Sequence, residues 1–261
     1  MKKISILCPS RQRCNTAVGY CESVFKMANH PERVELLFYL DRDDPELALY
    51  KVGFKAPPDF DKRFVNGVSG PTHNIYTIPG HKNIKLIVGD PKSVSESWND
   101  LARVCTGDIL LMGNDDLIHE TRGWDDVLDN EASKYPNEFY CIFFNDGINH
   151  GKHCAFPAVS RVWYDTLGYF TPGIFEFLYN DTWIFDIAKR LDTVHYVPKV
   201  MVRHNHWTVT KQKDATTKRH RDDNPGRKKR DEYLYNQTGH IREQAAEKIR
   251  CIMSGHLKSN V

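Results

Sequence analysis

The stretch WNDLARVCTGDILLMGNDD, residues 98–116, decides the fold class. A short predicted strand, residues 108–112, in which four apolar residues follow Asp108, stops abruptly at a polar cluster, residues 114–116. Ahead of that run, apolar side chains recur at helical spacing, at Trp98, Leu101, Ala102 and Cys105. This order predicts a helix that leads into a buried strand, as in a parallel α/β sheet.

Two similar apolar runs stand nearer the start of the chain. They are ISILC, residues 4–8, and VELLFYL, residues 34–40, and their nearly continuous apolar character predicts fully buried strands. Helical spacing over residues 14–29 predicts the helix between them, and residues 85–88 predict a third strand. We therefore expect right-handed β–α–β units and a parallel sheet.

The second half of the chain has a more mixed pattern. It predicts strands at residues 139–144 and 195–202 and helices at 181–191 and about 241–253. The segment 53–82 is rich in Pro, Gly and aromatic residues and lacks periodicity, which predicts a long binding loop or lid.

Composition limits the class of protein. Of 261 residues, 40% are hydrophobic and 27% charged, which excludes global disorder and suits one large or two small globular domains. The longest apolar runs are far shorter than the roughly 20 residues of a membrane span, and we expect no membrane or secretory segment. The seven cysteines form no CxxC pair, which predicts a reduced protein of the cytoplasm.

Positive charge gathers near the C-terminus. Nine Lys/Arg and four Asp/Glu lie in residues 211–231, and residues 227–230 are the densest part. Such a run is either a solvated surface or a contact for nucleic-acid phosphates, since clustered cations displace counterions from nucleic acid.

Three predicted strands end in polar clusters: residues 10–13, the acidic set from Asp41, and residues 114–116. Ligands of parallel α/β sheets bind outside the carboxyl ends of the strands, so these clusters should converge. Adjacent carboxylates at Asp115 and Asp116 suit a hard divalent cation that also binds diphosphate oxygens. The alternative is a solvated turn, because Asn and Asp favour turns.

The chain resembles the nucleotide-binding half of glycosyltransferases with the GT-A fold in ISILCPSRQR, LFYLDRDDP and WNDLARVCTGDILLMGNDD, which occur in this order. It is similar to the acceptor half in PAVSRVWYDTLGYF, YNDTWIFDIAKRL and VMVRHNHW, and particularly to a compact subgroup common in bacteriophages, for which the cytoplasm would be that of the host. The resemblance covers roughly residues 4–207. It implies an α/β, GT-A (Rossmann-like) mixed and mostly parallel sheet flanked by helices. The nucleotide-binding half would be residues 1–116 and the acceptor half 117–207, with a basic C-terminal extension and terminal helix at 208–261.

The resemblance also implies roles for single residues. Asp116 matches the direct ligand of Mn²⁺ or Mg²⁺, and at most one of His204 and His206 would be a further metal ligand. Asp181 matches the catalytic base, although an Asp at a helix start is also a common N-cap. Asn114 and Asn180 stand where the family pattern has acids. The residues implied in donor binding are Pro9, Ser10, Arg11, Arg13, Asp41, Asp43, Asn114 and Asp115.

The resemblance, together with the polar strand ends, thus implies a metal-dependent glycosyltransferase with a nucleotide diphosphate sugar, UDP being the family's common choice. The favoured acceptor is a hydroxymethyl-pyrimidine of DNA, and the alternative is a glycan or a protein. A nucleotide-binding protein without catalysis is the competing class, whereas a plain nucleic-acid-binding module would leave the three polar strand ends unexplained. The expected acceptor-side residues are Trp163, Trp207, Arg227, Lys228, Lys229 and Arg230.

Overall fold

The computed structural model describes residues 1–56 and 73–255. The strands of this part are β1 (Ile4–Ser10), β2 (Val34–Asp41), β3 (His73–Ile78), β4 (His81–Gly89), β5 (Ile109–Met112), β6 (Leu117–His119), β7 (Cys141–Asn145), β8 (Ala158–Ser160) and β9 (Val194–His204). They form one sheet of order β3-β4-β2-β1-β5-β8-β7-β9-β6. The mixed sheet predicted from the sequence is confirmed.

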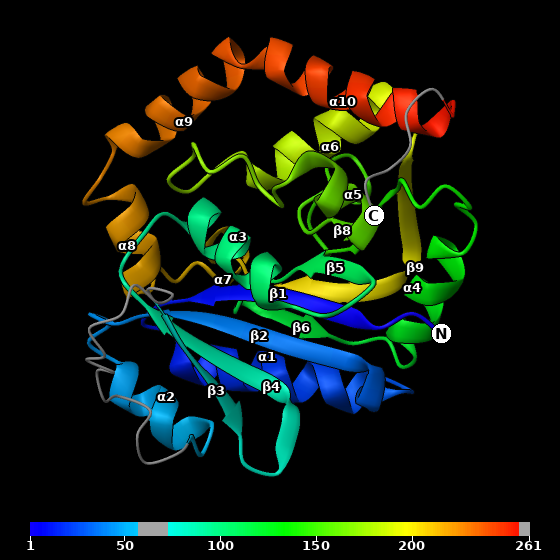
Figure 1. Ribbon diagram of the computed structural model, residues 1–261. Coiled ribbons are helices and arrows are strands. Elements are labelled where there is room, and N and C mark those ends of the chain that lie inside the picture. Colours follow the sequence, from blue (N-terminus) through cyan, green and yellow to red (C-terminus); the bar gives the residue numbers. More distant parts are fainter. Residues whose placement is uncertain (57–72, 256–261) are drawn as a thin grey trace, which may run out of the picture.

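Helices cover both faces of this sheet (Figure 1). The helices of the described residues are α1 (Cys14–Met27), α2 (Leu47–Gly53), α3 (Val94–Val104), α4 (Trp124–Ala132), α5 (Arg161–Leu167), α6 (Asn180–Leu191), α7 (Trp207–Thr210), α8 (Ala215–Arg221), α9 (Gly226–Gln237) and α10 (Gly239–Met253), with a short 3₁₀ turn at Pro31–Arg33. A capping box stands at the start of α3, where Ser93 and Glu96 bond reciprocally, and both residues can be read from the sequence.

The nucleotide-binding half is built on parallel strands. β1 lies between β2 and β5 and pairs in parallel with both, so that Ile4 is opposite Val34 and Ile109. β2 pairs in parallel with β4. Because these strands run in one direction, their carboxyl ends meet at one edge of the sheet. The polar clusters after β1, β2 and β5 are brought together there, as the sequence predicted.

The other half of the sheet is mixed. β5 and β7 pair antiparallel with β8, β7 is parallel to β9, and β6 is antiparallel to β9. The β6–β9 register places Leu117 opposite His204, and the backbone N–H of Asn205 donates to the carbonyl of Asp116 at 2.9 Å. This pairing carries the end of β9 to the acidic turn after β5.

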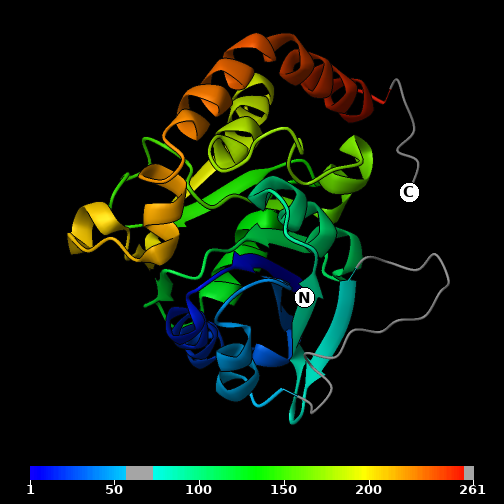
Figure 2. The same cartoon turned by 90° about the vertical axis from the view of Figure 1, so that its left-hand side faces the viewer.

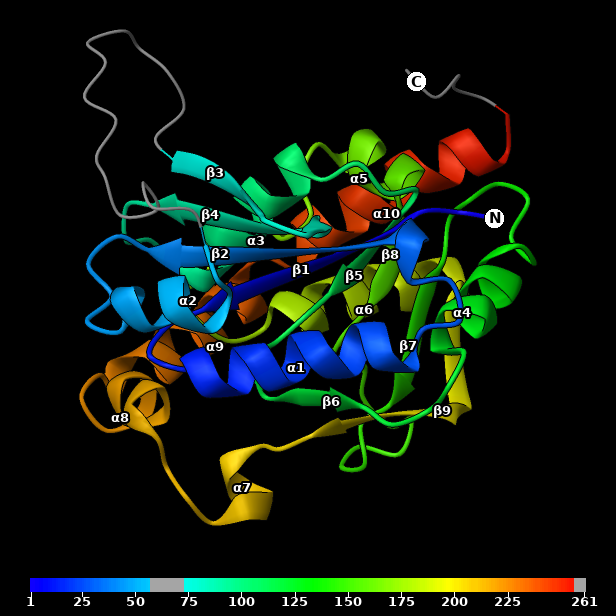
Figure 3. The ribbon, with the colours of Figure 1, turned by 90° about the horizontal axis from the view of Figure 1, so that it is seen from below.

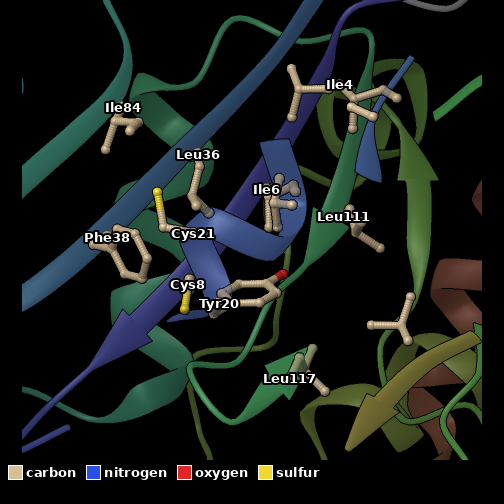
Figure 4. Close-up of a cluster of buried hydrophobic side chains, with 14 of the residues drawn as sticks. Ile4, Ile6, Cys8, Tyr20, Cys21, Leu36, Phe38, Ile84, Leu111 and Leu117 are labelled. Atoms are coloured by element: carbon tan, nitrogen blue, oxygen red, sulfur yellow. The ribbon is translucent and has the colours of Figure 1, made fainter. Parts of the chain in front are cut away.

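Buried side chains fill both sides of the sheet. On one side Ile6 and Cys8 of β1 pack with Tyr20 of α1 (Figure 4). On the other side Leu7 packs with residues of α3 such as Trp98. Covering on both faces explains the continuous apolar runs that predicted these strands.

The structure contradicts part of the long loop expected over residues 53–82. Residues 57–72 lie outside the described residues, but β3 and β4 form an antiparallel hairpin, so the prediction is wrong for residues 73–82. Tyr76 and Ile78 are buried whereas Ile75 is 48% exposed. This alternation is typical of an edge strand, and a short alternating run was masked by the loop-like composition around it.

The C-terminal extension packs onto the rest of the molecule. The predicted terminal helix is confirmed as α10, but α7, α8 and α9 precede it where the sequence indicated only polar chain. α9 and α10 form an arch beside α6 (Figures 1 and 2), and Ala245, Ala246 and Ile249 of α10 are buried in the core. None of the described helices is long and apolar enough to cross a membrane.

Candidate functional site

A cavity of about 490 Å³ lies at the carboxyl ends of the parallel strands, a size that suits a small-molecule ligand. Its wall comes from the ends of β1, β2, β5 and β9, from the chain before α6, and from α8 and α9. The predicted site residues found in this wall are Pro9, Ser10, Arg11, Arg13, Asp41, Asn114, Asp115, Asp116, Asp181, His204, His206, Trp207 and Arg227.

The acidic turn after β5 lies tightly against β1. Gly113 donates its backbone N–H to the carbonyl of Leu7, and a Cβ at this position would lie 2.8 Å from the side chain of Ile6. Only glycine permits this approach, which continues the β1–β5 pairing and directs the following residues into the cavity wall.

Asp115 has a structural role in this turn. Its carboxylate accepts hydrogen bonds from Ser10 Oγ at 2.6 Å and from Arg13 Nη1 at 2.9 Å. Burial raises the pKa of Asp115 to about 6, an effect that Asp116 adds to and Arg13 opposes. The side chains of Ser10 and Asp115 are thus engaged with each other and with Arg13.

The side chains of Asp116 and His204 lie next to each other in the cavity wall. Asp116 Oδ1 and His204 Nε2 lie 3.3 Å apart, and both atoms are buried without a hydrogen-bond partner among the described residues. Burial would raise the pKa of Asp116, yet His204 and Arg13 hold it below its usual value. The ring of Phe156 packs edge-on against His204 at 5.0 Å between centroids.

This pair fits two neighbouring positions of an octahedral metal ion, whose adjacent ligands lie about 3 Å apart at bond lengths of about 2.1 Å. Within the described part of the chain, no group of three or more His, Cys, Asp or Glu side chains could hold a metal. His206 Nδ1 instead lies 2.8 Å from Thr208 Oγ1 at the start of α7. The geometry favours His204 over His206, and a cation here would need phosphate or water oxygens to complete its shell.

Asp181 lies in the first turn of α6 and is not its N-cap, which is Tyr179 at φ 68°. Asp181 Oδ1 accepts from the backbone N–H of Thr182 at 2.7 Å, while Oδ2 lies 3.3 Å from His153 Nε2. Asp181 raises the pKa of the His153 imidazole; Asp146 adds to this effect, whereas burial and Lys189 oppose it. His153 comes from the chain between β7 and β8, and no sequence pattern singled it out.

Some predicted site residues lie elsewhere. Trp163 is 1% exposed in the core and absent from the cavity wall, so the prediction that it lies on the acceptor side of the site is wrong. The helical face that carries it packs inward. Asp43 is exposed and pairs with Arg11 outside the wall.

The basic run is divided between two environments. Arg227 Nε lies 2.7 Å from Glu176 and contributes to the cavity wall, and Arg230 also pairs with Glu176. Lys228 and Lys229 are exposed on α9 and lie outside the wall.

The sequence missed the part of the wall that comes from α8 and from the chain before α6. Asp231 of α9 is fully buried and accepts three backbone N–H groups, from Glu176 at 3.1 Å and from Phe177 and Leu178 at 2.9 Å each. These contacts join segments more than 50 residues apart, so no local pattern could predict them. The further wall residues that the sequence did not single out include Tyr39, Lys92, Phe156, Tyr179, Thr216, Thr217 and Arg219.

Solved structures share this architecture. The mannosyltransferase PcManGT from Pyrobaculum calidifontis, in complex with GDP-Man and Mn²⁺, matches at a TM-score of 0.54 with 10% identity, over 97% of this chain and 74% of its own. S. aureus TarS 1-349 in complex with UDP matches at 0.54 with 10% identity, over 77% of this chain and 59% of its own. No family model and no curated protein sequence matches the chain. At this identity the likeness shows the fold, and it confirms the glycosyltransferase fold that the sequence predicted.

Proposed function

We propose that this protein is a metal-dependent glycosyltransferase that moves a sugar from a nucleotide diphosphate, UDP being the first choice, to a hydroxyl group. The observation that carries the proposal is the pair Asp116 Oδ1 and His204 Nε2, which lie buried and 3.3 Å apart in the wall of a cavity of nucleotide size. Neither atom has a hydrogen-bond partner beyond the other among the described residues. The fold supports it, because its likenesses include proteins solved with GDP-Man and Mn²⁺ and with UDP.

The chain's own residues divide the work as follows. Asp116 and His204 would hold the cation, which would neutralise the negative charge that develops on the departing diphosphate. Arg11 Nε and Asn180 Oδ1 are further buried wall atoms without hydrogen-bond partners in the described part of the chain, and they offer a donor and an acceptor to the ligand. Unmade hydrogen bonds of this kind are costly in the empty site and favour an occupied one.

Asp181 acts as the base of the proposed reaction. Its carboxylate takes the proton of the acceptor hydroxyl while that oxygen bonds to the anomeric carbon and the bond to the diphosphate breaks. General-base help of this kind contributes about 10²–10⁴-fold to the rate. Its place in the first turn of α6 suits an anion, because the N-terminal end of a helix is positive.

For the acceptor we propose DNA that carries hydroxymethyl-pyrimidines. The support is the exposed pair Lys228 and Lys229 on α9, since cations of this kind bind the phosphate backbone. A hydroxymethyl group at the 5-position projects into the major groove, where an enzyme can reach it.

The test is a panel of nucleotide sugars with Mn²⁺, measured first by thermal shift and then by transfer to DNA with or without hydroxymethyl bases. We expect Asp116→Ala to abolish transfer, and Asp181→Asn to lower the rate at saturating substrate by at least about 10²-fold while donor binding survives. The exposed Asp165 on α5 gives a matched control, Asp165→Asn, which should retain full activity.

Two outcomes would contradict the proposal in different parts. Stabilisation by no nucleotide sugar, or undiminished turnover in Asp116→Ala, would refute a metal-dependent transferase. Transfer to a glycan or a peptide but to no hydroxymethylated DNA would refute only the acceptor.

A further inference from the structure

Arg13, for which the resemblance implied donor binding, already donates hydrogen bonds from all three nitrogens of its guanidinium group. Its Nη1 donates to Asp115 at 2.9 Å, its Nε to Asp214 at 2.6 Å, and its Nη2 to Asp214 and Thr217, both at 3.3 Å. Asp214 and Thr217 belong to the start of α8. Arg13 therefore ties α8 to the acidic turn and has little donor capacity left for a ligand.

Arg219, one turn further along α8, lies in the cavity wall with a different environment. The other wall cations are paired: Arg11 with Asp41 at 2.8 Å, Arg227 with Glu176 at 2.7 Å, and Lys92 with Asp100 at 2.5 Å. Arg219 has no ion pair within 4 Å among the described residues, although it is half-buried.

The charges around Arg219 make an anionic partner favourable. Burial lowers the pKa of Arg219, and the nearby charges of Arg11 and Arg227 lower it further, while Asp41 opposes them. Arginine stays ionised in proteins regardless, so the cost remains as unfavourable electrostatic energy in the empty cavity. Phosphate oxygens relieve such a site well, because the planar guanidinium can donate two parallel hydrogen bonds to them.

α8 is held in place from several directions. Thr216 Oγ1 donates to the carbonyl of Arg11 at 2.5 Å, and Asp214 caps the helix through the N–H of Thr217 at 2.7 Å. Figure 3 shows α8 beside the edge of the sheet where β1 and β2 end. Downstream, the Arg227–Glu176 pair and the Asp231 contacts fix α9 to the same cavity. The Arg219 side chain is thus carried on an anchored element rather than on a free tail.

We infer that Arg219 binds an anionic phosphate oxygen of the donor's nucleoside diphosphate, and that residues 214–231 form a wall of the donor site. The inference rests on the proposed function and names a residue of that site on the basic extension, for which the sequence left a solvated surface and a nucleic-acid contact as the alternatives. Part of the positive charge in this segment would then bind the phosphates of the nucleotide.

The test compares UDP and uridine binding by titration calorimetry, in the presence of Mn²⁺, for the wild type, Arg219→Gln and the matched control Lys218→Gln. Lys218 is the exposed neighbour on the same helix. We expect Arg219→Gln to weaken UDP binding about tenfold or more, to leave uridine binding unchanged, and to flatten the salt dependence of UDP binding, because an ionic contact is lost. Lys218→Gln should match the wild type in all three measurements.

Equal affinity for UDP in Arg219→Gln and wild type, or equal losses for UDP and uridine, would refute the phosphate contact. If Arg219→Gln does not fold, Arg219→Lys replaces it and should bind UDP more weakly with uridine binding intact, because a point charge cannot donate in the bidentate manner. Failure of the wild type to bind UDP, GDP or any nucleotide sugar would instead refute the proposed function itself.

Discussion

Asp231 joins α9 to the chain that forms the cavity wall before α6, and we predict that Asp231→Asn destabilises the protein and weakens donor binding together. The carboxylate is fully buried and accepts N–H groups from three successive residues, 176–178. The substitution keeps the size of the side chain and one acceptor oxygen, but it turns the other oxygen into an NH₂ donor.

The magnitude follows from these three bonds. If the remaining oxygen stays at the Phe177 side, the new NH₂ group faces the backbone N–H of Glu176, which is itself a donor. This N–H then loses its partner, which costs about 1–3 kcal/mol. The two remaining bonds lose their charge assistance, about 1 kcal/mol each, while the lower desolvation cost of a neutral amide offsets part of the loss. A net loss of about 3 kcal/mol corresponds to a fall in Tm of about 6–12 °C for a domain of this size.

The assay is thermal unfolding followed by circular dichroism, with a UDP titration on the same samples. Glu232→Gln, at the exposed neighbouring position of α9, is the control and should unfold at the wild-type temperature. Asp231→Asn should also bind UDP more weakly than the wild type, because residues 176–179 line the cavity. A Tm within about 2 °C of the wild type would show that Asp231 does not hold this wall.

Two further predictions concern histidines. Because His153 Nε2 lies 3.3 Å from Asp181, His153→Gln should lower kcat by roughly fivefold, which corresponds to one hydrogen bond of about 1 kcal/mol. It should also shift the acid limb of the pH–rate profile and leave the donor KM unchanged. An unaltered pH profile would show that His153 is only a packing residue. His119 is buried with both ring nitrogens unbonded among the described residues, and burial lowers its pKa to about 3. Below about pH 6.5 the unfolded chain therefore binds a proton at His119 that the folded state excludes. The free energy of unfolding thus falls as the pH drops, by about 2 kcal/mol between pH 7 and 5. Urea unfolding at pH 7 and pH 5 should show that the free energy of unfolding of His119→Gln falls by about 2 kcal/mol less than that of the wild type. The same pH dependence in the wild type and in His119→Gln would contradict this prediction.

Much of the fold followed from the sequence because its signals are local. The apolar runs at β1, β2 and β5, the helical spacing of α1 and the capping box of α3 depend on neighbouring residues, and the structure retains them. The β–α–β connections make these strands parallel, and parallel strands end at one edge. The cavity could therefore be predicted at residues 10–13, 41 and 114–116.

Tertiary structure alone decided which side chains of these clusters remain available to a ligand. Arg13 contacts Asp214, 201 positions away, which engages much of its hydrogen-bonding capacity. Arg219 enters the cavity from a segment whose composition indicated either a solvated surface or a nucleic-acid contact. Trp163 belongs to the core because the face of α5 that carries it turns inward. Such contacts depend on how whole elements pack, and packing joins residues whose distance along the chain carries no periodic or capping signal.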